Sequence, residues 1–393
     1  MAAAGIWIAF SFGIVLIIAT AISVVGTLVV PRGYDSRISR VSDRGVDLAF
    51  QLTTLWIKNF RRRDAILAWQ SPISLLVRLA LWIGLLLVGY ALVLTPVVPN
   101  SLPQAFAEAG SSMFTLGYAP PTNNGSSALD YVAAYTGLVV VGLQVGYLPT
   151  LYAAFNRRET LVTLLVARSG TPAWGPEILA RTRWGIYDGD PQVVLHEMFE
   201  AWQKWAAEVA ESHTTYLTLV RLRSPRPLSH WLTALLSVMD AAALHLSLAP
   251  SSQPKDSARL CLRMGFVAMN QIGRAMRLPV NDDPDPERDQ ISIGYAEFEQ
   301  AVTMLQRLNY PLERTAEQAW PHFRGWRLNY DMTALALAKA LDAPPSLWSG
   351  PRRFPSAPMP PLRPAVRAAG EGMKVPPPVT PDSAGHKETT QHD

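Results

Sequence analysis

Three segments of this chain are apolar enough and long enough to cross a lipid bilayer. They run from about Gly5 to Val30, from Leu79 to Val98 and from Tyr131 to Phe155. A helix that spans the hydrocarbon core needs roughly 20 predominantly apolar residues, each adding about 1.5 Å. A secretory signal peptide is the alternative for the first segment, but such peptides have a basic start and a shorter apolar core. We therefore predict an all-α membrane protein with three spans.

The basic residues between these segments predict how the chain is oriented. Those before the second segment are Arg32, Arg37, Arg40, Arg44, Lys58, Arg61, Arg62, Arg63 and Arg78. From Leu79 to Asn156 there is no Lys or Arg, and Arg157 and Arg158 follow at once. Because cytoplasmic loops are enriched in Lys and Arg, we expect residues 31–78 and everything after 156 to be cytoplasmic. The N-terminus and residues 99–130 are then outside, and we expect a multi-pass protein of a bacterial plasma (inner) membrane.

The external segment between the second and third spans is too short to cross the membrane but apolar enough to enter it. Leu102-Pro103 is typical of a helix start, because proline is tolerated in the first turn. Residues 104–114 suit a helix, residues 115–119 follow it, and Pro120-Pro121 ends the segment. Non-helical backbone at membrane depth is tolerated only where it is buried in protein or lines a polar cavity. The layout predicts an outer helix, a re-entrant helix, an extended segment and an inner helix.

The extended segment, Thr115-Leu116-Gly117-Tyr118-Ala119, resembles the potassium-channel signature Thr-Val-Gly-Tyr-Gly. The resemblance covers roughly residues 75–158. It implies a pore module of a bacterial ion channel type, in which carbonyl groups of residues 115–119 replace the hydration shell of permeant K⁺. It also implies that the tyrosine packs outward and braces the filter. Because one segment cannot surround an ion, it implies a homotetramer.

The end of this segment departs from the signature, whose last glycine is replaced here by Ala119 and followed by Pro120. Alanine at a position that requires a positive φ costs roughly 1 kcal/mol or more, so we expect a different shape there. A Pro-Pro exit is similar to that of cyclic-nucleotide-gated channels, which select weakly among monovalent cations. We expect a passive, potassium-selective cation channel. The alternatives are a poorly selective monovalent cation channel and a non-conducting membrane sensor or scaffold with a pore-like hairpin.

Two acidic residues flank the filter-like segment. Glu108 falls in the re-entrant helix, where it either braces the filter through hydrogen bonds or faces the external vestibule. Asp130 begins the third span. There a fourfold ring of carboxylates would concentrate cations, but an acidic residue is also favoured at a helix N-terminus.

Three glycines in the third span have two interpretations. Gly137, Gly142 and Gly146 allow neighbouring helices to approach closely, and the last two form a small-xxx-small pair. Together with Pro149 they could instead form a gating hinge. Both packing and gating stay open at this point.

The cytoplasmic loop between the first two spans is expected to contact lipid. Residues 52–69 mix Leu, Trp, Ile and Phe with the triplet Arg61, Arg62 and Arg63. This pattern predicts an interfacial helix lying against anionic headgroups. Stop-transfer charges without lipid specificity are the alternative.

The region after residue 156 is typical of a soluble, mainly helical domain, because apolar residues recur in it at helical spacing. It has no glycine-rich nucleotide-binding fingerprint and no catalytic constellation, so we expect neither an enzyme nor a cofactor. Cys261, the single cysteine, is expected in the core, and His213, His230 and His245 are structural or sense pH. The formal net charge of +4 is too small to indicate a nucleic-acid partner.

The chain is thereby divided into five parts. They are an N-terminal span (1–30), a cytoplasmic linker with the interfacial helix (31–74), the pore module (75–156), the cytoplasmic helical domain (157–345) and a Pro-rich tail (346–393). The tail is too polar and too rich in proline to bury a core, so we expect it to be disordered.

Overall fold

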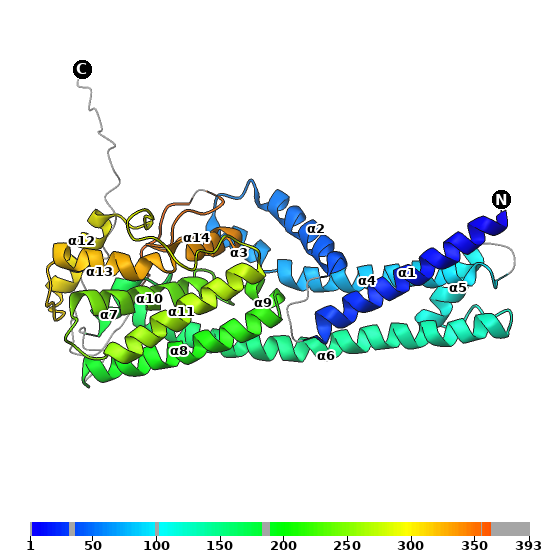
Figure 1. The fold of residues 1–393 in the computed structure, drawn as a ribbon, viewed down its shortest axis with the longest axis horizontal. Coiled ribbons are helices and arrows are strands. Elements are labelled where there is room, and N and C mark those ends of the chain that lie inside the picture. The colour runs from blue at the N-terminus through cyan, green and yellow to red at the C-terminus, as the bar shows by residue number, and fades with distance from the viewer. Residues whose placement is uncertain (1, 31–35, 99–101, 183–188, 355, 363–393) are drawn as a thin grey trace, which may run out of the picture. The chain divides into compact units, whose positions relative to one another are not determined.

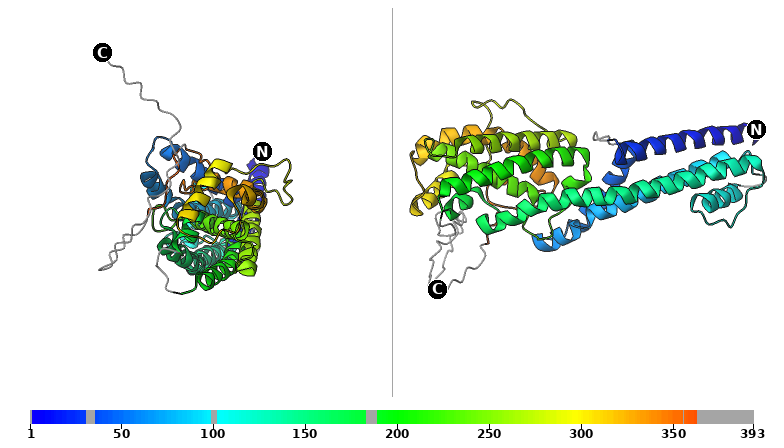
Figure 2. Two further views of the ribbon diagram at one scale, coloured as in Figure 1. Left: turned by 90° about the vertical axis from the view of Figure 1, so that its left-hand side faces the viewer. Right: turned by 90° about the horizontal axis from the view of Figure 1, so that it is seen from below.

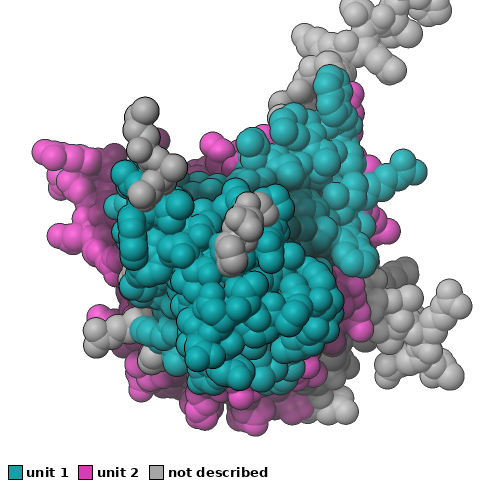
Figure 3. Space-filling model, turned by 90° about the vertical axis from the view of Figure 1, so that its right-hand side faces the viewer, with its two compact units in different colours: residues 1–57, 62–155, 215–222 teal, residues 58–61, 156–214, 223–393 magenta. Residues whose placement is uncertain are grey.

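The computed structural model describes residues 2–30, 36–98, 102–182, 189–354 and 356–362 (Figure 1). Within these residues the fold is all-α: it has fourteen helices, and its only β pairing consists of isolated bridges. The chain divides into two compact units, which Figure 3 colours separately. Unit 1 comprises residues 1–57, 62–155 and 215–222, and unit 2 comprises residues 58–61, 156–214 and 223–393.

Unit 1 contains the helices on which the predicted spans fall. Its elements are α1 (Ala2–Leu28), α2 (Arg37–Thr54), most of α3 (Phe60–Leu67), α4 (Gln70–Leu94), α5 (Leu102–Met113), the first part of α6 (Asn124–Ser169) and α9 (Thr218–Arg221). By length and composition, α1, α4 and α6 could each cross a membrane. This agrees with a multi-pass membrane protein.

The core of unit 1 is built around α4. Trp82 and Leu86 are fully buried, and the indole N–H of Trp82 donates to Oγ of Ser23 on α1 at 3.0 Å. Helices α1 and α4 lie side by side (Figures 1 and 2). Their close approach needs Gly89, where an added Cβ would lie 2.7 Å from a side-chain carbon of Ile17. The interior of unit 1 is therefore closely packed from helices far apart in sequence.

The predicted interfacial helix over residues 52–69 is not continuous. Helix α2 ends at Thr54 and α3 begins at Phe60, so the two helices are separated by a non-helical stretch. Arg61 and Arg62 are exposed, but Arg63 is only 1% exposed, and its guanidinium donates to the carbonyl oxygen of Ile57. A buried guanidinium cannot face headgroups, so the predicted lipid-binding triplet is wrong at its third position.

Unit 2 contains the remaining helices. They are the last part of α6, α7 (Gly175–Arg181), α8 (Pro191–Thr215), α10 (Trp231–Leu248), α11 (Lys255–Ala275), α12 (Tyr295–Arg307), α13 (Ala316–Leu328) and α14 (Asp331–Ala340). Helix α10 is long and apolar enough to be a fourth candidate span, but every one of its residues is buried within the protein. A helix that is apolar all round is either a span or a core helix. Here α7, α11, α13 and α14 pack around it.

A fully buried arginine connects the helices of unit 2. Arg327 on α13 donates to Asp240 on α10 at 2.5 Å and to Asp331 on α14 at 2.7 Å. Its third contact is the carbonyl oxygen of Trp348 at 2.7 Å, and Tyr330 donates to the same Asp240 oxygen at 2.9 Å. Removing one partner of such a buried pair leaves an uncompensated charge, which costs about 3–5 kcal/mol.

The beginning of the predicted disordered tail belongs to unit 2. Trp348 is buried between Trp174 and Phe323, with ring centroids 5.6 and 5.5 Å away. Arg352 is buried as well, and its guanidinium donates to the carbonyl oxygens of Ala343 and Pro344 at 2.5 Å each. The folded part therefore continues past the predicted boundary at residue 345. Residues 363–393 lie outside the described residues.

Candidate functional site

A helix begins at Leu102, as the sequence predicts, and small residues bring this helix, α5, close to α4. Ala105 and Ala109 are fully buried in a core that also contains Leu86 of α4 and Met113 at the end of α5. Small side chains at one face of a helix allow the backbones to approach each other. Helix α5 thus ends at a fixed place inside unit 1.

Gly137 of α6 forms the tightest of the glycine contacts in this region. A Cβ at this position would lie 2.4 Å from the carbonyl oxygen of Met113, the last residue of α5. Gly142 and Gly146 have nothing within 4 Å of an added Cβ. Packing therefore accounts for Gly137, whereas the other two glycines face open space in a single chain. Helix α6 continues through Pro149 without interruption.

Residues 114–119 leave α5 and fold back onto its last turn. The backbone N–H of Leu116 donates to the carbonyl oxygen of Ser111 at 2.8 Å, and the N–H of Ala119 donates to Oγ of Ser111 at 3.0 Å. The filter-like segment is therefore non-helical: it begins in a hydrogen-bonded turn at Phe114 and Thr115, and its later backbone N–H groups bond back to Ser111. The sequence does not predict this role of Ser111, because the role depends on how the following residues fold back.

Two residues of the filter-like segment have left-handed backbone conformations. The φ angles are +55° at Thr115 and +71° at Gly117, whereas Ala119 has no positive φ. Glycine adopts this region without steric cost, but for other residues such conformations cost about 1–3 kcal/mol. The absence of a positive φ at Ala119 agrees with the different shape that we expect there, and the left-handed non-glycine residue of the segment is Thr115.

The side chains of the filter-like segment find little packing within one chain. Leu116 is 66% exposed and Tyr118 is 64% exposed. The implied bracing role of Tyr118 would therefore need contacts from outside this chain.

Glu108 and Asp130 are buried, with exposed fractions of 1% and 7%. Glu108 lies close to Ser126 of α6 and to Asp130, and Asp130 lies close to Ser112 of α5. One oxygen of Glu108 and both carboxylate oxygens of Asp130 have no hydrogen-bond partner among the described residues. Neither carboxylate faces solvent, as an external vestibule or a ring at the outer mouth would require. Both carboxylates therefore lie in the interior between α5 and α6, each close to a serine of the other helix.

One face of α6 is apolar and exposed. Its large side chains are Tyr131, Tyr135, Leu138, Val145 and Tyr152. Gly142 and Pro149 are exposed on the same face, so the spacing alternates between four and three residues along the helix. Gln144 lies on the other side of α6 and is only 6% exposed.

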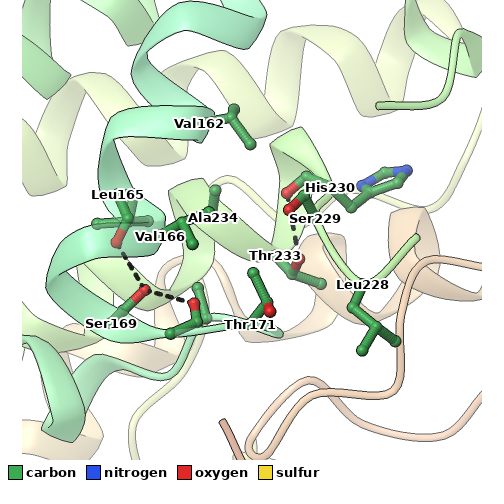
Figure 4. Close-up of a pocket in the computed structure, with 12 residues that line it drawn as sticks. Val162, Leu165, Val166, Ser169, Thr171, Leu228, Ser229, His230, Thr233 and Ala234 are labelled. Atoms are coloured by element: carbon green, nitrogen blue, oxygen red, sulfur yellow. Dashed lines mark hydrogen bonds between the residues drawn. The ribbon is translucent and has the colours of Figure 1, made fainter. Parts of the chain in front are cut away.

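Unit 2 has a small, partly open cavity beside the start of α10 (Figure 4). Its volume is about 10 Å³, which is the space of about one water molecule. Two of its hydroxyl groups are already engaged: Ser169 donates to the carbonyl oxygen of Leu165 and Thr233 to that of His230. The cavity is therefore too small for an organic ligand.

His213, His230, His245 and Cys261 of unit 2 are buried, whereas His196 and His322 are exposed. Burial lowers the pKa of His213 and His230 well below the ordinary value, and lowers that of His245 to about 4. Burial also raises the pKa of Cys261 to about 12, as expected for a core thiol. In the part of the chain that the structure describes, no group of three or more His, Cys, Asp or Glu side chains could hold a metal ion.

A scan against protein-family models and searches of curated proteins and of solved structures gave no match to this chain.

Proposed function

We propose that this chain is one subunit of a homotetrameric, potassium-selective cation channel, with the permeating K⁺ bound by residues 115–119. In this proposal α1, α4 and α6 cross a bacterial plasma membrane, and α5 with the filter-like segment enters it from outside. The N-terminus is external and unit 2 is cytoplasmic, in agreement with the positions of Lys and Arg along the sequence. No cofactor is needed, because conduction is passive.

One observation carries the proposal: the Thr-Leu-Gly-Tyr-Ala sequence is a non-helical segment that turns back onto α5 and lies, along the chain, between the candidate spans α4 and α6. Ser111 fixes this turn through the N–H groups of Leu116 and Ala119. A non-helical backbone at membrane depth leaves carbonyl groups unpaired, and these are the groups that coordinate ions in selectivity filters. Thr115 and Gly117 carry the positive φ angles.

The exposed face of α6 supports assembly from several copies. Tyr131, Tyr135 and Leu138 are 77%, 69% and 68% exposed in a single chain. Gly142 on the same face leaves room for a neighbouring helix or for an open cavity. Four copies would place this face toward a common axis, together with Leu116 and Tyr118.

A poorly selective monovalent cation channel is the second candidate, and Ala119-Pro120 favours it. Ala119 does not adopt the positive φ that the last glycine of the signature provides. One carbonyl group at the end of the filter then does not point inward. Selectivity depends on the number and arrangement of the carbonyl groups that do.

Reconstitution of the purified protein in a planar bilayer tests the proposal. With KCl on one side and NaCl on the other, we expect the current to reverse near the potassium equilibrium potential. Gly117→Ala should lower the current about tenfold or more, because a strain of roughly 1–2 kcal/mol arises in every subunit. Gly84→Ala is the matched control, since a Cβ at Gly84 meets nothing within 4 Å.

The other outcomes select among the alternatives. A reversal near zero under the same gradient would overturn potassium selectivity and leave the poorly selective channel. If a confirmed tetramer passes no current, conduction itself is refuted, and a sensor or scaffold is favoured.

A further inference from the structure

Helix α2 packs its polar face inward, which is the reverse of an ordinary amphipathic helix. Ser39, Ser42 and Thr54 are 2%, 6% and 0% exposed. At the start of the helix, Oγ of Ser36 accepts a hydrogen bond from the backbone N–H of Ser39 and lies 2.5 Å from Oγ of Ser23 on α1. Surface helices normally turn their apolar stripe toward the core. The outward face of α2 therefore needs an explanation.

The inward face is held by charged and polar contacts. Arg78 of α4 donates to both carboxylate oxygens of Asp43 at 2.7 Å. Asp47 accepts hydrogen bonds from Gln70, at 2.5 Å, and from Arg221 of α9. Both acidic residues of α2 are thus turned toward the rest of unit 1 and are paired there. This orientation of the helix is fixed by specific partners.

The outward face of α2 and the residues after it form an apolar stripe. Its members are Val41, Leu48, Leu52, Leu55 and Trp56, which are 66%, 57%, 56%, 53% and 90% exposed. Positions 41, 48, 52 and 55 recur at intervals that keep them on one side of a helix. An exposed apolar stripe of this kind marks a surface that another apolar phase covers.

Arginines border the stripe on one side. Arg37 lies one turn before Val41 and Arg44 lies one turn before Leu48, and both arginines are exposed. Residues four apart are neighbours on a helix surface. With Asp43 and Asp47 turned inward, the exposed surface of α2 is apolar and positively charged, with no exposed carboxylate among its described side chains.

We propose that the stripe of α2, bordered by Arg37 and Arg44, lies in the headgroup region of a bilayer that contains anionic lipid. Two features favour a lipid surface over a second copy of the chain. Arginine at the edge of an apolar helix face matches anionic phosphates, and Trp56 belongs to the residue type that is enriched at membrane interfaces. In addition, α2 connects α1 and α4, so it follows one candidate span and precedes another. The inference stands whether or not the chain conducts ions.

Site-specific fluorescence in vesicles tests this surface on the full-length protein. Cys261 is the only cysteine, so Cys261→Ser gives a background for single labels. Leu48→Cys and, separately, Val41→Cys would carry a bimane label in vesicles of phosphatidylcholine with or without phosphatidylglycerol. Brominated lipid should quench both labels at least about threefold more than a label at Lys204→Cys on α8, a side chain that is 71% exposed. Replacing Arg37 and Arg44 by Gln should weaken quenching in the phosphatidylglycerol vesicles. Each replacement should lower, by about fivefold, the equilibrium constant between the lipid-bound and the water-exposed position of α2.

Two results would overturn the proposal. Quenching of both labels by aqueous iodide and not by brominated lipid would place the stripe in water. Efficient disulfide formation between two copies of the unlabelled Leu48→Cys variant, without lipid quenching of the labelled one, would assign the stripe to a contact between chains. Because neither readout measures current, failure here is distinguishable from failure of the proposed channel.

Discussion

At the scale of single residues, the contact between Gly137 and Met113 fixes how the end of α5 meets α6. The backbone carbonyl of Met113 occupies the position that a Cβ at residue 137 would need, at 2.4 Å. Since a backbone oxygen cannot move aside as a flexible side chain can, any larger residue must displace a helix. The filter-like segment begins two residues after Met113, so its position depends on the same contact.

We therefore predict that Gly137→Ala destabilises the protein by about 1–3 kcal/mol, the usual cost of overpacking. The measurement is the melting temperature of the detergent-solubilised protein, followed by tryptophan fluorescence. Gly84→Ala serves as control and should be neutral or slightly stabilising, because alanine favours the helix and meets nothing there. Equal melting temperatures for the two variants would contradict the packing role of Gly137.

The Glu108 and Asp130 pair gives a second prediction. Between residues 79 and 156 these are the only charged side chains, so no cationic side chain in that segment compensates them. Glu108→Gln should leave the melting temperature unchanged or raise it, because it removes a buried like charge without removing volume. In the Glu108→Gln variant, Asp130→Asn should change the free energy of unfolding by less than it does in the natural chain. A double-mutant cycle should give a coupling free energy of about 0.5–3 kcal/mol. Additive effects would show that the two carboxylates do not interact.

Single-residue roles were predictable where a residue type has a narrow set of uses. The positive φ of Gly117 agrees with the freedom that the signature requires of glycine there. The burial of Glu108 and Asp130 was not predictable, because it depends on which faces of α5 and α6 meet. For Gly137, Gly142 and Gly146 the spacing alone left packing and hinge open, and only contacts separated the first glycine from the other two.

At the scale of elements, the long apolar helices were predictable and the orientation of α2 was not. Apolar length identifies α1, α4 and α6 without tertiary information. The periodicity of α2 shows that it has two faces, but the choice of inward face depends on Arg78 and Arg221, which are distant in sequence. The predicted interfacial helix included Arg61–Arg63 because the local sequence shows only their charge. Whether Arg63 is buried depends on tertiary contacts that the local sequence does not show.

Helix α10 gives a prediction about pH, because His245 is buried in it beside Tyr310. Nδ1 of His245 lies 2.7 Å from the tyrosine hydroxyl, and burial lowers the histidine pKa to about 4 from an ordinary value of 6.5. Between these values the unfolded state binds a proton that the folded state does not, so stability falls as the pH is lowered from 6.5 to 4. The contribution is about 3 kcal/mol, at roughly 1.4 kcal/mol per pKa unit.

His245→Gln removes this titration and should flatten the pH dependence of the melting temperature between pH 6.5 and 4. Some dependence should persist, because burial also lowers the pKa of His213 and His230. The variant is expected to be less stable at pH 7, where the natural histidine is neutral in both states, so the slope and not the absolute value is diagnostic. An unchanged slope of the melting temperature against pH would refute the assignment of this titration to His245.

At the scale of the whole molecule, the sequence separated an apolar first part from a helical second part, and the two compact units divide at residues 155 and 156. Two features of the whole molecule could not be predicted from the sequence. Residues 215–222 belong to unit 1 although they lie far along the chain, because Leu219 and Leu222 join the core around Leu75 and Tyr147. The Pro-rich composition after residue 345 gave no indication that part of this segment is buried. Trp348 and Arg352 hold the segment against unit 2, but they are single residues in a polar sequence.

Two truncations test where the folded part of unit 2 ends. A chain that stops after Leu362 keeps Trp348 against Trp174 and Phe323, and keeps the carbonyl oxygen that accepts from Arg327. A chain that stops after Pro344 loses these contacts and leaves one donor of a buried guanidinium without its acceptor. Loss of a buried tryptophan alone costs about 3–5 kcal/mol, so the shorter chain should show a clearly lower melting temperature or fail to accumulate.

Trp348→Ala in the full-length chain separates this effect from the loss of length, because it removes the indole but keeps the backbone acceptor of Arg327. It should fall between the two truncations in stability, since it loses the aromatic packing and retains the hydrogen bond. Equal stability of all three chains would mean that residues 345–354 add nothing to unit 2, as the predicted boundary at residue 345 implied. A stable chain ending at Leu362 together with an unstable one ending at Pro344 would place the end of the folded domain within residues 345–362.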